Sequence, residues 1–301
     1  MRILLFFVVI LLTNACFPEK DPPLVELSHN LSQKLAAAEG TFAVAFADLK
    51  TGDTLFINAH EPFHAASTMK TPVMIELYKQ AEAGLFSLDD SILVKNEFSS
   101  IVDGSPYQMQ VSDDSEAVLY DKIGTMIPIR ELMFEMITQS SNLATNILID
   151  LVDAKNVTAS MRELGAPDIA VLRGVEDIKA FDKGLSNSTT AYDLMKIFEA
   201  IGRDQIISEE ACQEMMQVLF AQKFNEIIPA KLPADVMVAH KTGTITGVQH
   251  DSGIVVLPGG HAYVLILLSK ELPSPETGVM LLADVSKLVY DYVVSDKHQQ
   301  N

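Results

Sequence analysis

Strand-forming residues occur in two separated parts of this chain, and a long helical stretch lies between them. Apolar runs and alternating patterns predict strands at residues 41–49, 54–58, 236–244, 252–257 and 262–269. Glycine-containing turns at residues 50–53 and 258–260 predict two hairpins. Since the two hairpins come from opposite ends of the sequence, we expect one antiparallel five-stranded sheet to which both ends contribute.

The other segments show apolar residues at helical spacing. Residues 24–39 and 276–294 predict terminal helices that flank the sheet, while residues 67–222 are mostly helical. One inner helix is expected to open after Pro128, and another to be capped by Ser141 or Asn142.

These elements predict an α/β (α+β) fold with two tightly joined lobes. Residues 24–64 and 223–301 are expected to form the sheet lobe, and residues 65–222 an inserted all-helical lobe, within a single catalytic domain spanning residues 24–301. Because ligand sites favour the junctions between such units, we expect the active site between the lobes.

Composition excludes several function classes. The chain has 301 residues with 22 basic and 40 acidic side chains, a net charge of -18 that disfavours nucleic-acid and anionic-lipid partners. Its seven histidines are scattered, and none shows ligand spacing with a second, so a metal site is not expected. A small-molecule substrate and a monomer are the expectation.

The first fifteen residues are typical of an export signal, because Arg2 precedes a short apolar run that ends in small and polar residues. The run ends on Ala15-Cys16, which resembles a bacterial lipoprotein signal; Cys16 would then carry a lipid and residues 16–23 would form a tether. Ordinary signal cleavage nearby is the alternative. A periplasmic or cell-surface lipoprotein, on the membrane only through this anchor, is expected.

Three short motifs occur in order: Ser67-Thr68-Met69-Lys70, Ser140-Ser141-Asn142 and Lys241-Thr242-Gly243. Each is weak alone, because a serine at a helix start is commonly a cap. In the first motif, however, residues three apart share a helix face, so Lys70 can take a proton from the Ser67 hydroxyl.

That role requires a partly neutral Lys70, which needs either burial or a nearby positive charge such as Lys241. Pro72 predicts an irregular first turn after Ser67. Lys241 lies in a predicted strand, where a charged side chain needs a partner or an open cleft. His240 points to the opposite face and is interpreted as structural.

Together these residues resemble the serine β-lactamase and penicillin-binding protein superfamily, most closely the class A β-lactamases. The resemblance implies that Ser67 is acylated, that Lys70 accepts or relays its proton, and that Ser140 protonates the leaving nitrogen. It further implies substrate binding by the residues Asn142, Lys241, Thr242, Gly243 and Thr244. The backbone N–H groups of Ser67 and Thr244 would form an oxyanion hole.

The sequence departs from the family pattern at several positions. Ser141 replaces a usual aspartate, which predicts altered local hydrogen bonding. Glu176 is the candidate base for deacylation, but Ala180 stands where the family has an asparagine, and the alternative for Glu176 and Asp177 is a solvated acidic turn. Asn187 replaces an aspartate that would pair with an arginine, here Arg173.

The leading hypothesis is therefore a β-lactamase that opens the β-lactam amide through a serine acyl-enzyme, with no metal or organic cofactor. Two alternatives keep the acylation step: a penicillin-binding D-alanyl-D-alanine peptidase or transpeptidase, and a sensor that is acylated without hydrolysis. The sequence leaves the segment 96–122 unplaced relative to the cleft.

Overall fold

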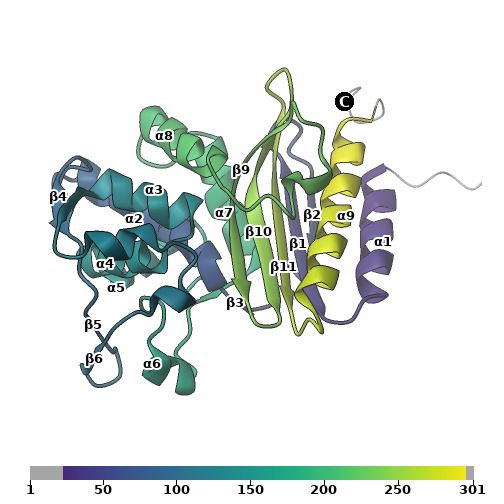
Figure 1. Ribbon diagram of the computed structural model, residues 1–301. Helices are drawn as coiled ribbons and strands as arrows, with labels where there is room; N and C mark the ends of the chain where they lie inside the picture. The colour runs from purple at the N-terminus through teal and green to yellow at the C-terminus, as the bar shows by residue number, and fades with distance from the viewer. Residues whose placement is uncertain (1–22, 296–301) are drawn as a thin grey trace, which may run out of the picture.

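The computed structural model describes residues 23–295 and is built on one five-stranded antiparallel sheet (Figure 1). The strand order is β2-β1-β11-β10-β9, so strands from the two ends of the chain lie side by side, as predicted. The strands are β1 (Thr41–Asp48), β2 (Thr54–Ile57), β9 (Met237–Ile245), β10 (Val248–Val256) and β11 (Ala262–Lys270). The predicted export signal, Cys16 and nearly all of the tether lie outside the described residues.

Strand β10 begins at Val248, four residues before the predicted start at Ser252. The missed residues Gln249, His250 and Asp251 are polar but buried, because each finds a hydrogen-bond partner in the structure. Asp251 accepts from His240, which is buried on β9 as its structural interpretation requires. A hydrophobic pattern cannot detect a strand whose buried side chains are polar.

Each face of the sheet packs on helices, and the side chains of β1 show how. Phe42, Val44 and Phe46 belong to the same hydrophobic core as the terminal helices α1 (Pro23–Ala36) and α9 (Pro275–Val293). The intervening small residues Ala43, Ala45 and Ala47 face the opposite core, where α7 (Ala191–Gly202) crosses the sheet. Figure 1 shows α1 and α9 together on one face of the sheet.

The inserted part carries most of the helices. They are α2 (Lys70–Glu82), α3 (Ile129–Thr138), α4 (Asn142–Val152), α5 (Ala154–Glu163), α6 (Ile178–Asp182) and α8 (Glu209–Phe220). Helix α3 follows Pro128 and α4 is capped by the Ser141 hydroxyl, as the sequence predicts. Within residues 23–295, no helix is long and apolar enough to cross a membrane.

The inserted part is nevertheless less helical than its sequence suggests. Between α2 and α3 the chain forms short strands and single 3₁₀ turns: β4 (Ser91–Leu93), β5 (Phe98–Ser99), β6 (Pro106–Tyr107), η2 (Val111–Asp113), η3 (Val118–Lys122) and β7 (Met126–Pro128). Two further short strands, β3 (Phe63–His64) and β8 (Ser188–Thr189), pair with each other; β3 comes just before the turn that carries Ser67, and β8 just before α7. Helix α7 also belongs to residues 65–222, yet it packs on the sheet.

Candidate active site

Ser67 lies in the 3₁₀ turn η1 (Ala66–Met69), directly before α2. This irregular turn is what Pro72 predicts, because a proline at the third position of α2 cannot donate a hydrogen bond to the turn before it. The preceding residue Ala66 has a positive φ of 45° and donates its N–H to Nδ1 of His64 at 3.0 Å. The strained backbone holds Ser67 half-buried near the start of the turn, where it lines a cleft.

Strand β9 passes close to this turn, and Gly243 makes the approach possible. A Cβ atom at Gly243 would lie 3.1 Å from the backbone nitrogen of Ser67 and 3.1 Å from that of Thr68. The next residue, Thr244, is exposed to the cleft and its hydroxyl donates to Oε1 of Gln249 at 3.0 Å. Strand β9 thus packs against the turn that carries Ser67, and Ser67 and Thr244 line the same cavity.

Lys70 is fully buried, and its ammonium group is held by the loop that joins α3 to α4. Its Nζ donates to the carbonyl oxygen of Ser140 at 2.7 Å, to the Ser140 hydroxyl at 3.2 Å and to Oδ1 of Asn142 at 2.9 Å. Within the described residues, Lys70 Nζ makes no hydrogen bond to the Ser67 hydroxyl, although the Lys70 backbone N–H donates to the Ser67 carbonyl oxygen. Burial lowers the pKa of Lys70 to about 7, although the carboxylates of Asp114 and Glu176 act in the opposite direction.

Lys241 reaches the same serine from the sheet. Its Nζ donates to the Ser140 hydroxyl at 3.1 Å and to the carbonyl oxygen of Thr242 at 2.9 Å. Burial, and next the positive charge of Lys70, hold the pKa of Lys241 well below its ordinary value. Of the two causes that the sequence left open for a lowered Lys70 pKa, burial is the one that acts, and the charge of Lys241 is not among the causes.

The start of α4 is anchored by a carboxylate that the sequence did not single out. Asp114 accepts the backbone N–H groups of Asn142 and Leu143, each at 2.8 Å. The Asp113 carbonyl oxygen accepts from the Asn142 side chain at 3.1 Å, and the Ser115 hydroxyl donates to the Ser140 carbonyl at 3.0 Å. The only advance signal was the acidic run in the unplaced segment 96–122.

Glu176 lies on the loop before α6, with a positive φ of 60° and a half-buried side chain. Burial raises the pKa of Glu176, and the negative charge of Asp113 acts in the same direction. Its neighbour Asp177 is buried and structural rather than solvated, because it accepts from Ser100, from the Ile101 backbone and from the backbone of α6.

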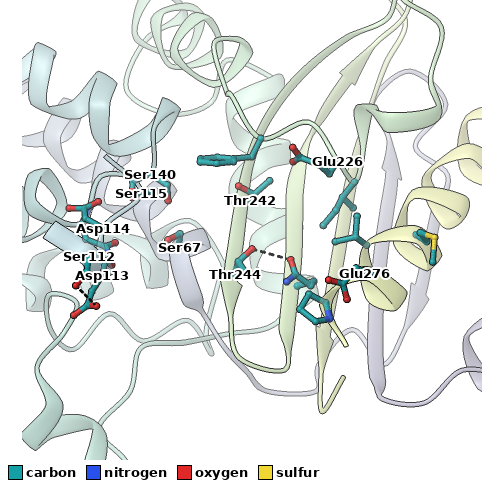
Figure 2. Close-up of a pocket in the computed structure, with 17 residues that line it drawn as sticks. Ser67, Ser112, Asp113, Asp114, Ser115, Ser140, Glu226, Thr242, Thr244 and Glu276 are labelled. Atoms are coloured by element: carbon teal, nitrogen blue, oxygen red, sulfur yellow. Dashed lines mark hydrogen bonds between the residues drawn. The ribbon is translucent and has the colours of Figure 1, made fainter. Parts of the chain in front are cut away.

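Two cavities meet at Ser67. The larger, of about 910 Å³, extends from Ser140 and Asn142 past Thr242 and Thr244 to Glu226 and Glu276. In Figure 2, Ser67 lies between the helical side, which carries Ser140 and Asp114, and strand β9 with Thr242 and Thr244. The smaller cavity, of about 470 Å³, places Glu176 on the other side of Ser67 and Asn142. Across residues 23–295, no three His, Cys, Asp or Glu side chains are grouped to hold a metal ion.

Comparisons with known proteins agree with this geometry. The sequence model of the Beta-lactamase enzyme family matches residues 26–293. The chain belongs to this family. It is a class A-like serine hydrolase by family, fold and motif order.

Individual relatives are distant but cover nearly the whole chain. A β-lactamase of Bacteroides uniformis is 23% identical over 95% of this chain and 98% of its own length. A solved β-lactamase from Sphaerobacter thermophilus is 26% identical, with a TM-score of 0.74 over 87% of this chain and 96% of that one. The structure of PBP-A is also 26% identical, with a TM-score of 0.77 over 91% of this chain and 97% of that chain.

The loop that carries Glu176 departs from the class A pattern at both ends. Asn187 holds the loop through backbone groups instead of an ion pair: it accepts from Leu172 N at 2.8 Å and Arg173 N at 3.2 Å, and donates to the Arg173 carbonyl at 2.9 Å. The Arg173 guanidinium donates to the carbonyl oxygens of Leu185 and Gly174. Ala180, in place of the usual asparagine, is buried and supplies no side-chain hydrogen bond.

Proposed function

We propose that Ser67 attacks the amide carbonyl of a β-lactam ring and that the resulting acyl-enzyme is hydrolysed. One observation carries the proposal. The Ser140 hydroxyl lies between two buried lysines, 3.2 Å from Lys70 Nζ and 3.1 Å from Lys241 Nζ, in the cavity that Ser67 lines. Such a chain of donors and acceptors can move a proton from the nucleophile to a leaving nitrogen.

In the proposed acylation step, neutral Lys70 removes the proton of the Ser67 hydroxyl as its oxygen bonds to the carbonyl carbon. A pKa of about 7 leaves a large share of Lys70 neutral at neutral pH. When the ring C–N bond breaks, the Ser140 hydroxyl donates its proton to the nitrogen. Lys70 or Lys241 then returns a proton to Ser140, so no net charge is left on that oxygen.

The remaining motif residues are proposed to bind the substrate. The N–H groups of Ser67 and Thr244 would receive the carbonyl oxygen, whose negative charge grows in the transition state. Lys241 and Thr242 would hold the substrate carboxylate and Asn142 the side-chain amide. Gly243 favours this arrangement, because a Cβ atom there would be tight against the backbone of Ser67 and Thr68. We propose that these residues belong to a single catalytic domain of residues 24–301 and that the enzyme is a monomer.

The first test compares the wild-type protein with Ser67→Ala. After rapid mixing with a penicillin and with a cephalosporin, mass spectrometry should detect a transient adduct on the wild-type protein, and hydrolysis should follow. In Ser67→Ala we expect hydrolysis to fall by roughly 1,000-fold or more with no adduct, because the nucleophile is absent. A variant that keeps its turnover would contradict the assignment of Ser67.

Deacylation is proposed to use Glu176 as the base for a water molecule. Glu176 and Ser67 line the same 470 Å³ cavity, and the raised pKa of Glu176 makes its carboxylate a stronger base than an ordinary glutamate. The glutamate would take a proton from water as the water oxygen attacks the ester carbonyl. The bond between the carbonyl carbon and the Ser67 oxygen then breaks, and the proton that Glu176 took from the water returns to the Ser67 oxygen.

In Glu176→Gln, acylation should continue while hydrolysis of the adduct slows by about 100-fold or more, because the amide cannot accept the proton. The persistence of the adduct, measured by mass spectrometry over minutes, reports this step directly. Asp182→Asn is the matched control, since Asp182 is an exposed carboxylate on the neighbouring helix α6. Equal deacylation rates in Glu176→Gln and Asp182→Asn would remove Glu176 from the mechanism.

A second candidate function keeps acylation without rapid hydrolysis, as in a penicillin-binding peptidase or sensor. Two observations favour it: Ala180 gives the loop no side-chain support for a water near Glu176, and PBP-A is among the similar structures. The adduct on wild-type Ser67 distinguishes the two functions. It disappears within the turnover time of a β-lactamase, whereas it accumulates to one acyl group per chain in a penicillin-binding protein.

We further propose that residues 1–15 direct export and that Cys16 carries a lipid, on the sequence pattern alone. An exported enzyme would meet β-lactams in the periplasm or at the cell surface and could protect the cell from them. In cells fed a fatty acid with a clickable tag, the wild-type protein should be labelled in the membrane fraction. Label retained by Cys16→Ser would contradict the lipidation site.

A further inference from the structure

We propose that Asp114 is a positioning residue for acylation: its carboxylate fixes the start of α4, which carries Asn142, and supplies a negative charge toward the Lys70 ammonium. The proposal rests on the proposed acylation of Ser67. It adds a residue that lies outside all three motifs, in the loop between β6 and η3.

The contacts of Asp114 make it the main anchor of the α4 start. One carboxylate oxygen accepts from Asn142 N at 2.8 Å, and the other accepts from Leu143 N at 2.8 Å and from the Tyr120 hydroxyl at 3.0 Å. The first N–H groups of a helix have no partner within the helix, and they favour a negative charge. Asp114 supplies both the acceptors and the charge.

The local sequence of α4 explains why a distant residue is needed. Ser141 is the N-cap, and its neutral hydroxyl accepts only from Ala144 N, at 3.2 Å. The first turn of α4 contains no acidic residue of its own. The carboxylate that accepts from Asn142 N therefore comes from 28 positions away in the sequence.

Asn142 connects this anchor to the proposed proton acceptor. Its backbone N–H donates to Asp114, while its side-chain oxygen accepts from Lys70 Nζ at 2.9 Å. The charged groups that face Lys70 are Asp114 and Glu176, which favour the ammonium form, and Lys241, which shares the Ser140 hydroxyl. Burial opposes the ammonium form, and Asp114 is the largest of the effects that support it.

The groups around Asp114 are mostly acidic. Asp113 and Glu116 lie in the same loop as Asp114. The Tyr120 hydroxyl donates to Asp114, and the pKa of Tyr120 is raised by burial and by the Asp114 carboxylate. The Asp113 carboxylate accepts from its neighbour Ser112 at 3.1 Å and makes no hydrogen bond to α4 within the described residues. Asp113 and Asp114 are therefore both aspartates of the same loop, but only the Asp114 carboxylate accepts hydrogen bonds from the start of α4.

This difference defines the experiment, which measures the rate of Ser67 acylation by a fluorescent penicillin between pH 5 and 9. In the wild type the rate should fall as the pH drops through about 7, because protonated Lys70 cannot accept a proton. Asp114→Asn removes a charge that favours protonation, so this acid limb should move down by roughly one pH unit. The plateau rate should also fall about tenfold, since an amide oxygen replaces only one of the two acceptors.

Two further variants separate charge from geometry. Asp113→Asn removes the same charge one residue earlier and should leave the acid limb in place. Asp114→Glu keeps the negative charge but moves it, so the acid limb of the rate profile should stay at the wild-type pH while the plateau rate falls. If Asp114→Asn does not fold, this variant still tests whether the position of the carboxylate matters for acylation. An unshifted limb in folded Asp114→Asn, or a wild-type plateau in Asp114→Glu, overturns the proposal. A wild-type protein without any acylation overturns the proposed function instead.

Discussion

Two buried lysines that share one serine hydroxyl impose the strongest constraint on this structure. An ammonium group removed from water is costly unless oxygen atoms replace its hydration, and Lys70 and Lys241 both find such oxygens at Ser140. The lysines stand on α2 and β9, far apart in sequence, and Ser140 stands on the loop between α3 and α4. The sheet and the inserted helices must therefore pack closely, because otherwise two buried lysine amino groups would lose their hydrogen-bond partners.

Several features keep this meeting point in place. At Gly243 an added Cβ atom would lie 3.1 Å from Ser67 N, so glycine leaves the room that β9 needs beside this turn. The positive φ angles of Ala66 and Ser140 mark strained backbone on both sides of the cleft. Small alanines on one face of β1 leave room for α7 against the sheet. Close packing of the surrounding core thus keeps the strained backbone at the cleft in place.

Much of this arrangement could be predicted from the sequence because it depends on local patterns. Hairpin glycines predicted the turns, Pro128 predicted the start of α3, and Ser141 predicted the cap of α4. Asp114 could not be predicted, since its role depends on contacts with residues 28 or more positions away in a segment without regular spacing. Burial of Lys70 likewise depends on the whole packed structure. The proposed role of Lys70 in the sequence motif required a lowered pKa, but the sequence alone could not show whether the pKa is lowered.

The central claim, that burial leaves Lys70 able to accept a proton at neutral pH, is tested most directly by its own titration. Lysine labelled with ¹³C at Cε gives a resonance whose position follows the charge of Nζ, and a Lys70→Arg variant assigns the signal. We predict a midpoint of about 7, with the ammonium form below it and the neutral amine above it. A midpoint at the ordinary lysine value of about 10.4 would contradict the account.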